Sequence, residues 1–144
     1  MKGTDTQNLL KESDAGVKMG VSAIDDVLDK VSSDKLLNIL NESKEKHQQL
    51  GSKIHELLEK EHDETKEPNP IAKSMSWIKT NVMLAMDKND QTIADLITDG
   101  CNMGVKSLNR YLNQYAAASD EAKSFTKELI ALEESLVKDI ACYL

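Results

Sequence analysis

The chain has 144 residues, of which 3% are aromatic and 30% are charged, and its net charge at pH 7 is −7. This length fits one domain (1–144) with a single core, and the abundance of Ala, Leu, Lys, Glu and Asp is typical of helical proteins. The negative charge argues against a nucleic-acid partner, because phosphate binding requires a basic surface. The sequence lacks an apolar run long enough to cross a bilayer and an apolar leader at 1–8, so we expect a cytoplasmic protein.

Two helices joined by a short turn are predicted in the first part of the chain. The first covers about 5–31, and its apolar residues are spaced by three and four: Leu10, Val17, Val21, Ile24, Leu28 and Val31. The turn at 32–34 carries serine and aspartate oxygens that can cap the next helix. That helix runs to about 61, with Leu36, Leu40, Leu50, Ile54 and Leu57 on its inner face. Because the turn is short, the two helices should be antiparallel, and 5–62 forms one hairpin.

A long connection follows at 63–90. Its first part is polar and contains both prolines, which end the preceding helix. We expect a short fifth helix from Pro70 to about Met86. Its Trp77, Met83 and Met86 could form an exposed apolar patch through which the protein forms homo-oligomers. The length of the connection could also let hairpins exchange between two chains.

The second hairpin is predicted at 91–144. Its first helix should run from about 91 to 115, with Ala94, Thr98, Cys101, Val105, Leu108, Leu112 and Tyr115 inside. After a turn at 116–119, the last helix should run from 120 to the end, with Phe125, Leu129, Leu136, Ile140 and Tyr143 inside. Two hairpins joined by one long crossover are the ferritin-like four-helix-bundle topology, so the sequence predicts an all-α fold of this kind.

The two hairpins are related by an internal repeat. With an offset of 84, moving to 86 at the turn, identical residues fall at Met19/Met103, Gly20/Gly104, Val21/Val105, Leu28/Leu112, Ser33/Ser119, Asp34/Asp120, Glu42/Glu128, Leu50/Leu136, Ile54/Ile140 and Leu58/Leu144. Such a repeat predicts a pseudo-twofold axis relating the hairpins. Glycine in mid-helix costs about 1 kcal/mol relative to alanine. Gly20 and Gly104 therefore indicate either a close helix approach or a bulky neighbour or small ligand that needs the space.

Polar residues interrupt the apolar faces, and besides Thr98, which is equivalent to Asp14 in the repeat, they are Asp14, His47, Cys101 and Glu133. His47 and Glu133 are equivalent in the repeat, and folding each hairpin about its turn places His47 near the level of Val17 and Glu133 near Met103. Two carboxylates, an imidazole and a thiol in one layer could hold iron or another transition metal. Alternatively, they are ordinary core residues, with the imidazole satisfied by one hydrogen bond and Glu133 turned toward solvent. Cys101 and Cys142 lack metal-site spacing and are interpreted as free thiols, although a disulfide is an alternative.

Residues 71–115 resemble the central part of a bacterial family of ferritin-like four-helix-bundle proteins of unknown function. The resemblance rests on a tryptophan in the crossover helix (Ser74-Met75-Ser76-Trp77), on Ile93-Ala94-Asp95-Leu96, and on Tyr111. Spore-coat-type proteins of the same superfamily are similar through Asp90-Gln91-Thr92-Ile93-Ala94. Acidic residues that many members carry before the tyrosine are replaced here by Cys101 and Gly104. The resemblance therefore implies the fold rather than di-iron chemistry.

The sequence contains no complete catalytic motif. A nucleophile elbow, a phosphate-binding glycine loop and a nucleotide fingerprint are all missing. This leaves enzymatic activity undecided and favours a non-catalytic structural or interaction protein without a cofactor, linked through the resemblance to stress or sporulation. The alternative is a metal-binding or redox protein that uses the four polar core residues.

Overall fold

The computed structural model describes residues 2–61 and 89–144. These residues form α1 (Lys2–Leu28), α2 (Asp34–Lys60), α4 (Asp90–Gln114), α5 (Asp120–Ile140) and a short 3-10 helix, η1 (Ala141–Tyr143). The prediction of an all-α four-helix bundle is confirmed, and each predicted boundary of these four helices lies within four residues of the observed one. The fifth helix expected at 70–86, with Trp77, Met83 and Met86, lies outside the described residues.

Three of the helices begin at a capping side chain. Ser33, Asn89 and Ser119 are in extended conformations, and each accepts a hydrogen bond from the backbone N–H three residues later. These bonds satisfy N–H groups that have no partner inside the helix. The capping chemistry expected at 32–34 is therefore present, at Ser33.

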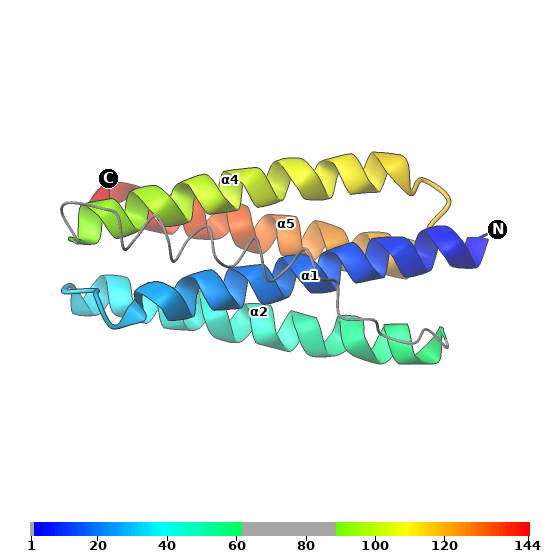
Figure 1. Cartoon of the computed structure of the whole chain (residues 1–144), viewed down its shortest axis with the longest axis horizontal. Helices are drawn as coiled ribbons and strands as arrows, with labels where there is room; N and C mark the ends of the chain where they lie inside the picture. The colour runs from blue at the N-terminus through cyan, green and yellow to red at the C-terminus, as the bar shows by residue number, and fades with distance from the viewer. Residues whose placement is uncertain (1, 62–88) are drawn as a thin grey trace.

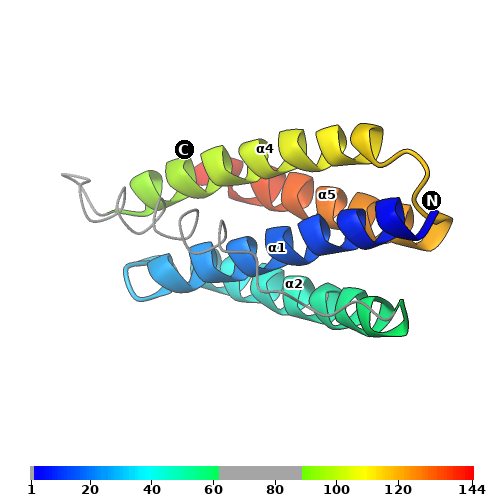
Figure 2. The ribbon, with the colours of Figure 1, turned by 45° about the vertical axis from the view of Figure 1, so that its right-hand side comes forward.

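The helices form two antiparallel hairpins packed side by side (Figures 1 and 2). The helix α1 packs on α2, α4 packs on α5, and the hairpins meet through α2 against α5 and α1 against α4. Across the diagonal, α1 also packs on α5. The chain direction in Figure 1 shows α2 running parallel to α4, and α1 parallel to α5.

Contacts at both ends of the bundle fix this arrangement. Asp90, in the first turn of α4, accepts hydrogen bonds from the backbone N–H groups of Ser32 and Ser33 at 2.8 and 3.0 Å. At the opposite end, Thr6 in α1 accepts the N–H of Ser119 at 2.8 Å. Thr6 and Asp90 are equivalent in the repeat, as are Ser33 and Ser119, so the pseudo-twofold symmetry extends to the hydrogen bonds that close the two ends.

The end of α2 and the start of α4 lie at opposite ends of the bundle. Gln7, near the start of α1, donates a hydrogen bond to the Glu61 carbonyl at 3.1 Å. Asp90, by contrast, lies at the turn between α1 and α2. The chain between Glu61 and Asn89 therefore joins opposite ends of the bundle.

The apolar core is divided into two clusters. One lies toward the start of α1 and contains Leu9, Leu10, Val17, Leu50, Ile54, Leu57, Leu58, Leu108, Ala118, Ala122, Leu129 and Ile130. The other contains Ile24, Val27, Leu36, Leu40, Ile93, Ala94, Ile97, Cys101, Leu136 and Ile140. Along α2 and α5, His47 and Glu133 fall between residues of the first cluster and residues of the second.

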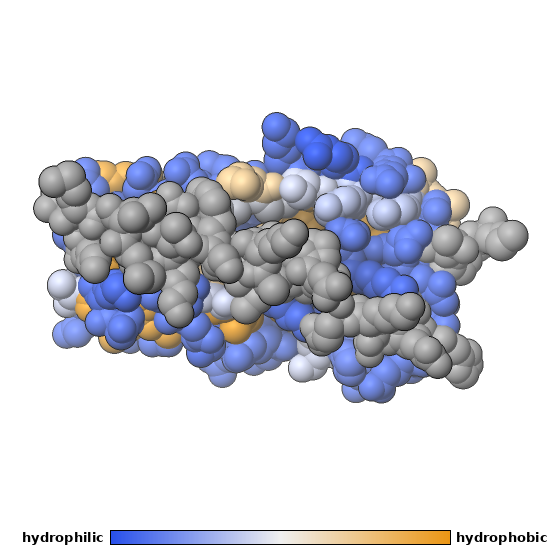
Figure 3. All heavy atoms as spheres, viewed as in Figure 1, coloured by the Kyte–Doolittle hydropathy of each residue, from blue (hydrophilic) through white to orange (hydrophobic). Residues whose placement is uncertain are grey.

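The buried face of each helix is wider than the predicted stripe. Leu9, Val27, Leu58, Ile93, Ile97 and Ile130 are buried but were not predicted, whereas Val21, Leu28, Val31, Val105, Leu112, Tyr115, Phe125 and Tyr143 are only partly buried. Each helix contacts at least two others, so its core face covers a broad arc rather than one row. The face shown in Figure 3 is mainly hydrophilic outside its grey residues.

Candidate functional site: a buried polar layer

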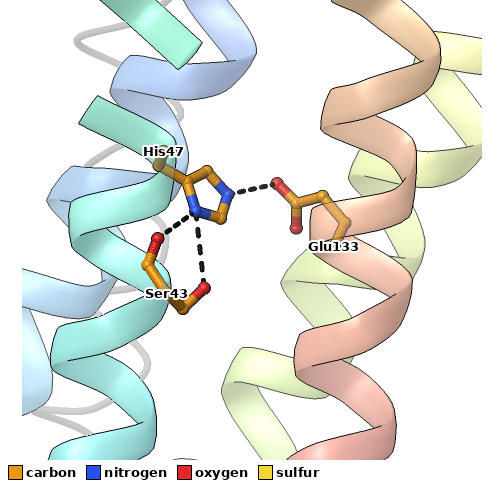
Figure 4. A network of polar contacts seen from close by, with 3 residues as sticks. All are labelled: Ser43, His47 and Glu133. Atoms are coloured by element: carbon orange, nitrogen blue, oxygen red, sulfur yellow. Dashed lines mark hydrogen bonds and ion pairs between the residues drawn. The ribbon is translucent and has the colours of Figure 1, made fainter. Parts of the chain in front are cut away.

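A histidine and a glutamate meet at the centre of the bundle (Figure 4). His47 Nε2 lies 3.3 Å from Glu133 Oε1, and the two residues are 1% and 6% exposed. On its other side, Nδ1 lies 2.7 Å from the Ser43 carbonyl and 3.4 Å from the Ser43 hydroxyl. A ring nitrogen that faces a carbonyl must carry a proton. His47 Nδ1 therefore donates to Ser43, and a protonated Nε2 donates to Glu133 Oε1.

Two glycines make room for this pair. A Cβ atom on Gly20 of α1 would lie 2.9 Å from His47 Cδ2 and 3.0 Å from Nε2. A Cβ atom on Gly104 of α4 would lie 3.8 Å from both Cδ and Oε1 of Glu133. Of the alternatives raised for these glycines, a bulky neighbour explains Gly20, because the imidazole occupies the space that a side chain would need. Gly104 leaves ordinary contact distances and is less constrained.

In the first hairpin, the residue of α1 that lies beside His47 differs from the predicted one. His47 lies beside Gly20, about one turn beyond Val17, whose side chain packs on Gly51 instead. If His47 lay beside Val17, the chain would reverse at Ser32. Because His47 lies beside Gly20, the midpoint of the reversal falls between Ser33 and Asp34. In the second hairpin, Glu133 lies beside Gly104, one residue from the predicted level.

Cys101 belongs to this layer. It is 5% exposed on α4, and burial, followed by the charge of Glu133 and a hydrogen bond to it, raises the pKa of the thiol. Cys101 is therefore held as a neutral thiol and not as a reactive thiolate. Both cysteines are free, as predicted, and Cys142 is exposed.

Asp14 does not join the layer. Its carboxylate forms an ion pair with Lys18 on the next turn of α1, at 3.0 Å. Gly20, which faces His47, lies six residues further along, or about 9 Å along the helix axis. Three of the four predicted ligands, His47, Cys101 and Glu133, therefore belong to the same layer. Asp14 lies one layer away and is paired with Lys18.

The pKa of His47 is raised above its ordinary value of 6.5. Burial lowers this pKa, but the hydrogen bond to Glu133, the charge of Glu133 and the Ser43 carbonyl together outweigh burial. The protonated imidazole is thus favoured by its two acceptors. Within residues 2–61 and 89–144, no group of three or more His, Cys, Asp or Glu side chains is arranged to hold a metal ion.

Two buried polar contacts were not predicted from the sequence. Ser43 supports His47 from one turn earlier on α2. Ser13 and Thr126 hydrogen bond to each other at 2.8 Å between α1 and α5, and Thr126 also donates to the Ala122 carbonyl. A signal was present for Ser13 and Thr126, because small hydroxyl residues at core spacing often pair with each other or with the preceding turn.

Comparison with protein-family models, with curated proteins and with solved structures gave no match. None of the helices that the structure describes is long and apolar enough to cross a membrane. The chemistry of the polar layer is therefore the basis for proposing a function.

Proposed function

We propose that this protein is a non-catalytic ferritin-like four-helix bundle that acts as a structural or interaction module. The helix directions support the ferritin-like assignment, because α2 and α4 are parallel and the chain between them joins opposite ends of the bundle. The link to stress or sporulation is supported by the family resemblance described above.

The observation that carries the proposal is that the polar residues buried in the bundle already have partners; among the described side chains, the hydroxyl of the partly buried Thr98 is the one buried polar atom without a hydrogen bond. Thr6, Ser13, Asp14, Ser43, His47, Thr126 and Glu133 all form hydrogen bonds or ion pairs within the bundle. A catalytic group must be able to reach a substrate, and its pKa is usually matched to proton transfer near neutrality. The thiol of Cys101 is buried and its pKa is raised, so the chemistry of this layer fits a role in stability and specificity better than one in catalysis.

Light scattering coupled to size-exclusion chromatography tests the interaction role. We expect the untagged protein to self-associate, and the predicted patch at Trp77, Met83 and Met86 gives the variants to compare. Replacing the three residues with serine should reduce the mass to that of one chain. A parent protein that stays monomeric at high concentration would contradict self-association.

A second candidate is metal binding in the polar layer, favoured by the contact of His47 with Glu133 and the interaction of Cys101 with the same carboxylate, although the three side chains are not arranged around a metal ion in the described residues. An imidazole, a thiolate and a carboxylate are suitable ligands for iron or zinc. Binding would require the metal to displace the proton on His47 Nε2 and the proton of the Cys101 thiol. The raised pKa values of both groups oppose this displacement.

Metal content separates the two candidates. The protein is purified without chelator, and iron(II) is then added anaerobically. Metal in proportion to protein, lost in His47→Ala and Glu133→Ala but retained in the exposed control His55→Ala, would establish the metal site. Metal-free protein under both conditions would support the structural role.

A further inference from the structure

The contact between His47 and Glu133 is made by equivalent positions of the repeat. The offset that aligns Ser33 with Ser119 also aligns these two residues, and their side chains meet across the boundary between α2 and α5. The flanking glycines, Gly20 and Gly104, are equivalent as well. The pair therefore lies on the pseudo-twofold axis, where each hairpin presents the same position to the other.

This position distinguishes the correct pairing of hairpins from the incorrect ones. A pseudo-symmetric hairpin could also pair with the same hairpin of a second chain, because most of its apolar residues have an equivalent of the same kind. Pairing two first hairpins would bring two His47 side chains together. Pairing two second hairpins would bring two Glu133 carboxylates together in the core, where like charges cannot both stay ionised.

We propose that His47 and Glu133 form a recognition pair that makes the first hairpin assemble with the second hairpin and not with its own kind. Buried polar residues at a single core position specify register and partner in coiled coils by the same mechanism. Other groups around the pair are neutral: Ser43 on α2, Gly20 on α1 and the protonated thiol of Cys101 on α4. Charge complementarity at this layer therefore depends on His47 and Glu133.

An exchange of the two residues tests the proposal. His47→Glu places two carboxylates in the layer, and Glu133→His places two imidazoles there. We expect His47→Glu to raise the unfolding equilibrium constant at pH 7 by at least about 100-fold, because one buried charge loses its partner. Glu133→His should have a smaller effect, since a neutral imidazole can accept the proton of a second one.

The double variant H47E/E133H restores one imidazole and one carboxylate, and both glycines still leave room for them. If the two substitutions acted independently, their effects on the unfolding equilibrium constant would multiply. We expect the constant of the double variant to be at least about 100-fold lower than that product. The pH dependence gives a second readout: His47→Glu should gain stability on acidification and Glu133→His on alkalinisation. The exposed pair His55 and Glu59, 3.1 Å apart, is the control, and its exchange should change stability little.

The proposal would be overturned if the stability lost in the double variant equalled the sum of the losses in the two single variants, because each side chain would then act only through its own helix. The same conclusion would follow if the two single variants showed the pH dependence of the parent. Neither result depends on whether the protein self-associates or binds metal, so the inference stands apart from the proposed function.

Discussion

At the scale of single residues, the glycine beside the imidazole is the most constrained position in the layer. A Cβ on Gly20 would lie 2.9 and 3.0 Å from ring atoms of His47, which cannot move away because Ser43 and Glu133 hold it. We expect Gly20→Ala to destabilise the protein by about 1–3 kcal/mol, since overpacking outweighs the gain in helix propensity. Urea denaturation measures the change.

Gly104→Ala is the matched control, because it changes the equivalent residue of the repeat. Its Cβ would meet Glu133 at 3.8 Å, an ordinary contact distance. We expect this variant to be as stable as the parent or up to about 1 kcal/mol more stable, through helix propensity alone. Equal destabilisation by both substitutions would contradict the packing described for Gly20.

The pKa of His47 predicts how stability depends on pH. Because this pKa is raised in the folded state, the stability that it contributes is fully present below about pH 6.5. That stability is lost as the pH rises through the folded-state pKa. We expect the free energy of unfolding of the parent to fall relative to that of His47→Gln as the pH is raised from 6 toward 9. Parallel profiles would mean that the imidazole is neutral in the folded protein.

The two cysteines should differ in reactivity. Cys142 is exposed, whereas Cys101 is 5% exposed and its thiol pKa is raised. Because the thiolate is the reactive form, a thiol reagent at pH 8 should modify Cys142 at least about 100-fold faster than Cys101. Spectrophotometric counting of modified thiols, with Cys142→Ser as the reference, measures both rates. Rapid modification of two thiols in folded protein would place Cys101 near solvent.

At the scale of helices, Asp90 connects the two hairpins at one end of the bundle. Its carboxylate accepts two backbone N–H groups from the turn between α1 and α2. Hydrogen bonds to a charged group contribute about 1.5–3 kcal/mol when shielded, and here one is exposed and the other partly buried, so we expect Asp90→Ala to cost about 1–2 kcal/mol. Thermal denaturation would show this loss, and Asp95→Ala, at an exposed position of the same helix, is the control. If the two substitutions have equal effects, the contact at the turn contributes little.

The sequence predicted the helices well because their signals are local. Apolar spacing and capping serines identify a helix without knowledge of its neighbours, which is why the boundaries agree closely. The buried faces were less predictable. Ile93 and Ile97 are buried because α4 packs on more than one helix, and that depends on tertiary arrangement.

The candidate site was only partly predictable, because its local pattern could be recognised but its tertiary contacts could not. His47, Cys101 and Glu133 were recognised as polar residues on apolar faces, and the repeat related two of them to each other. Asp14 has the same pattern, yet Lys18 four residues later provides it with a cation inside α1. Ser43 was missed, because a serine in a helix carries no signal until the residue that it supports is known.

At the scale of the whole molecule, the hairpin is the unit of assembly. Each hairpin has its own capping serine and mid-helix glycine and contributes one member of the central pair. The ends are closed by hydrogen bonds from one hairpin to the other, at Thr6 in one case and Asp90 in the other. The interactions described between the two hairpins can therefore also form between hairpins of two chains, provided that the central charges are complementary.

This equivalence predicts that two defective variants will repair each other. In His47→Glu, both hairpins carry a carboxylate at the central position, and in Glu133→His both carry an imidazole. If the two variants exchange hairpins, each bundle in the mixed dimer again contains one imidazole and one carboxylate. Domain exchange is a low-cost route to such dimers, because it uses contacts that already exist.

We therefore expect an equimolar mixture, unfolded in urea and refolded together, to form a heterodimer that is more stable than either variant refolded alone. Native mass spectrometry identifies the heterodimer by mass, and urea denaturation measures its stability. The double variant H47E/E133H refolded with the parent is the control, because each of these chains has a complementary pair within itself and gains nothing from exchange. A mixture that contains only the two separate variants would show that the hairpins pair within one chain even when their central charges are mismatched.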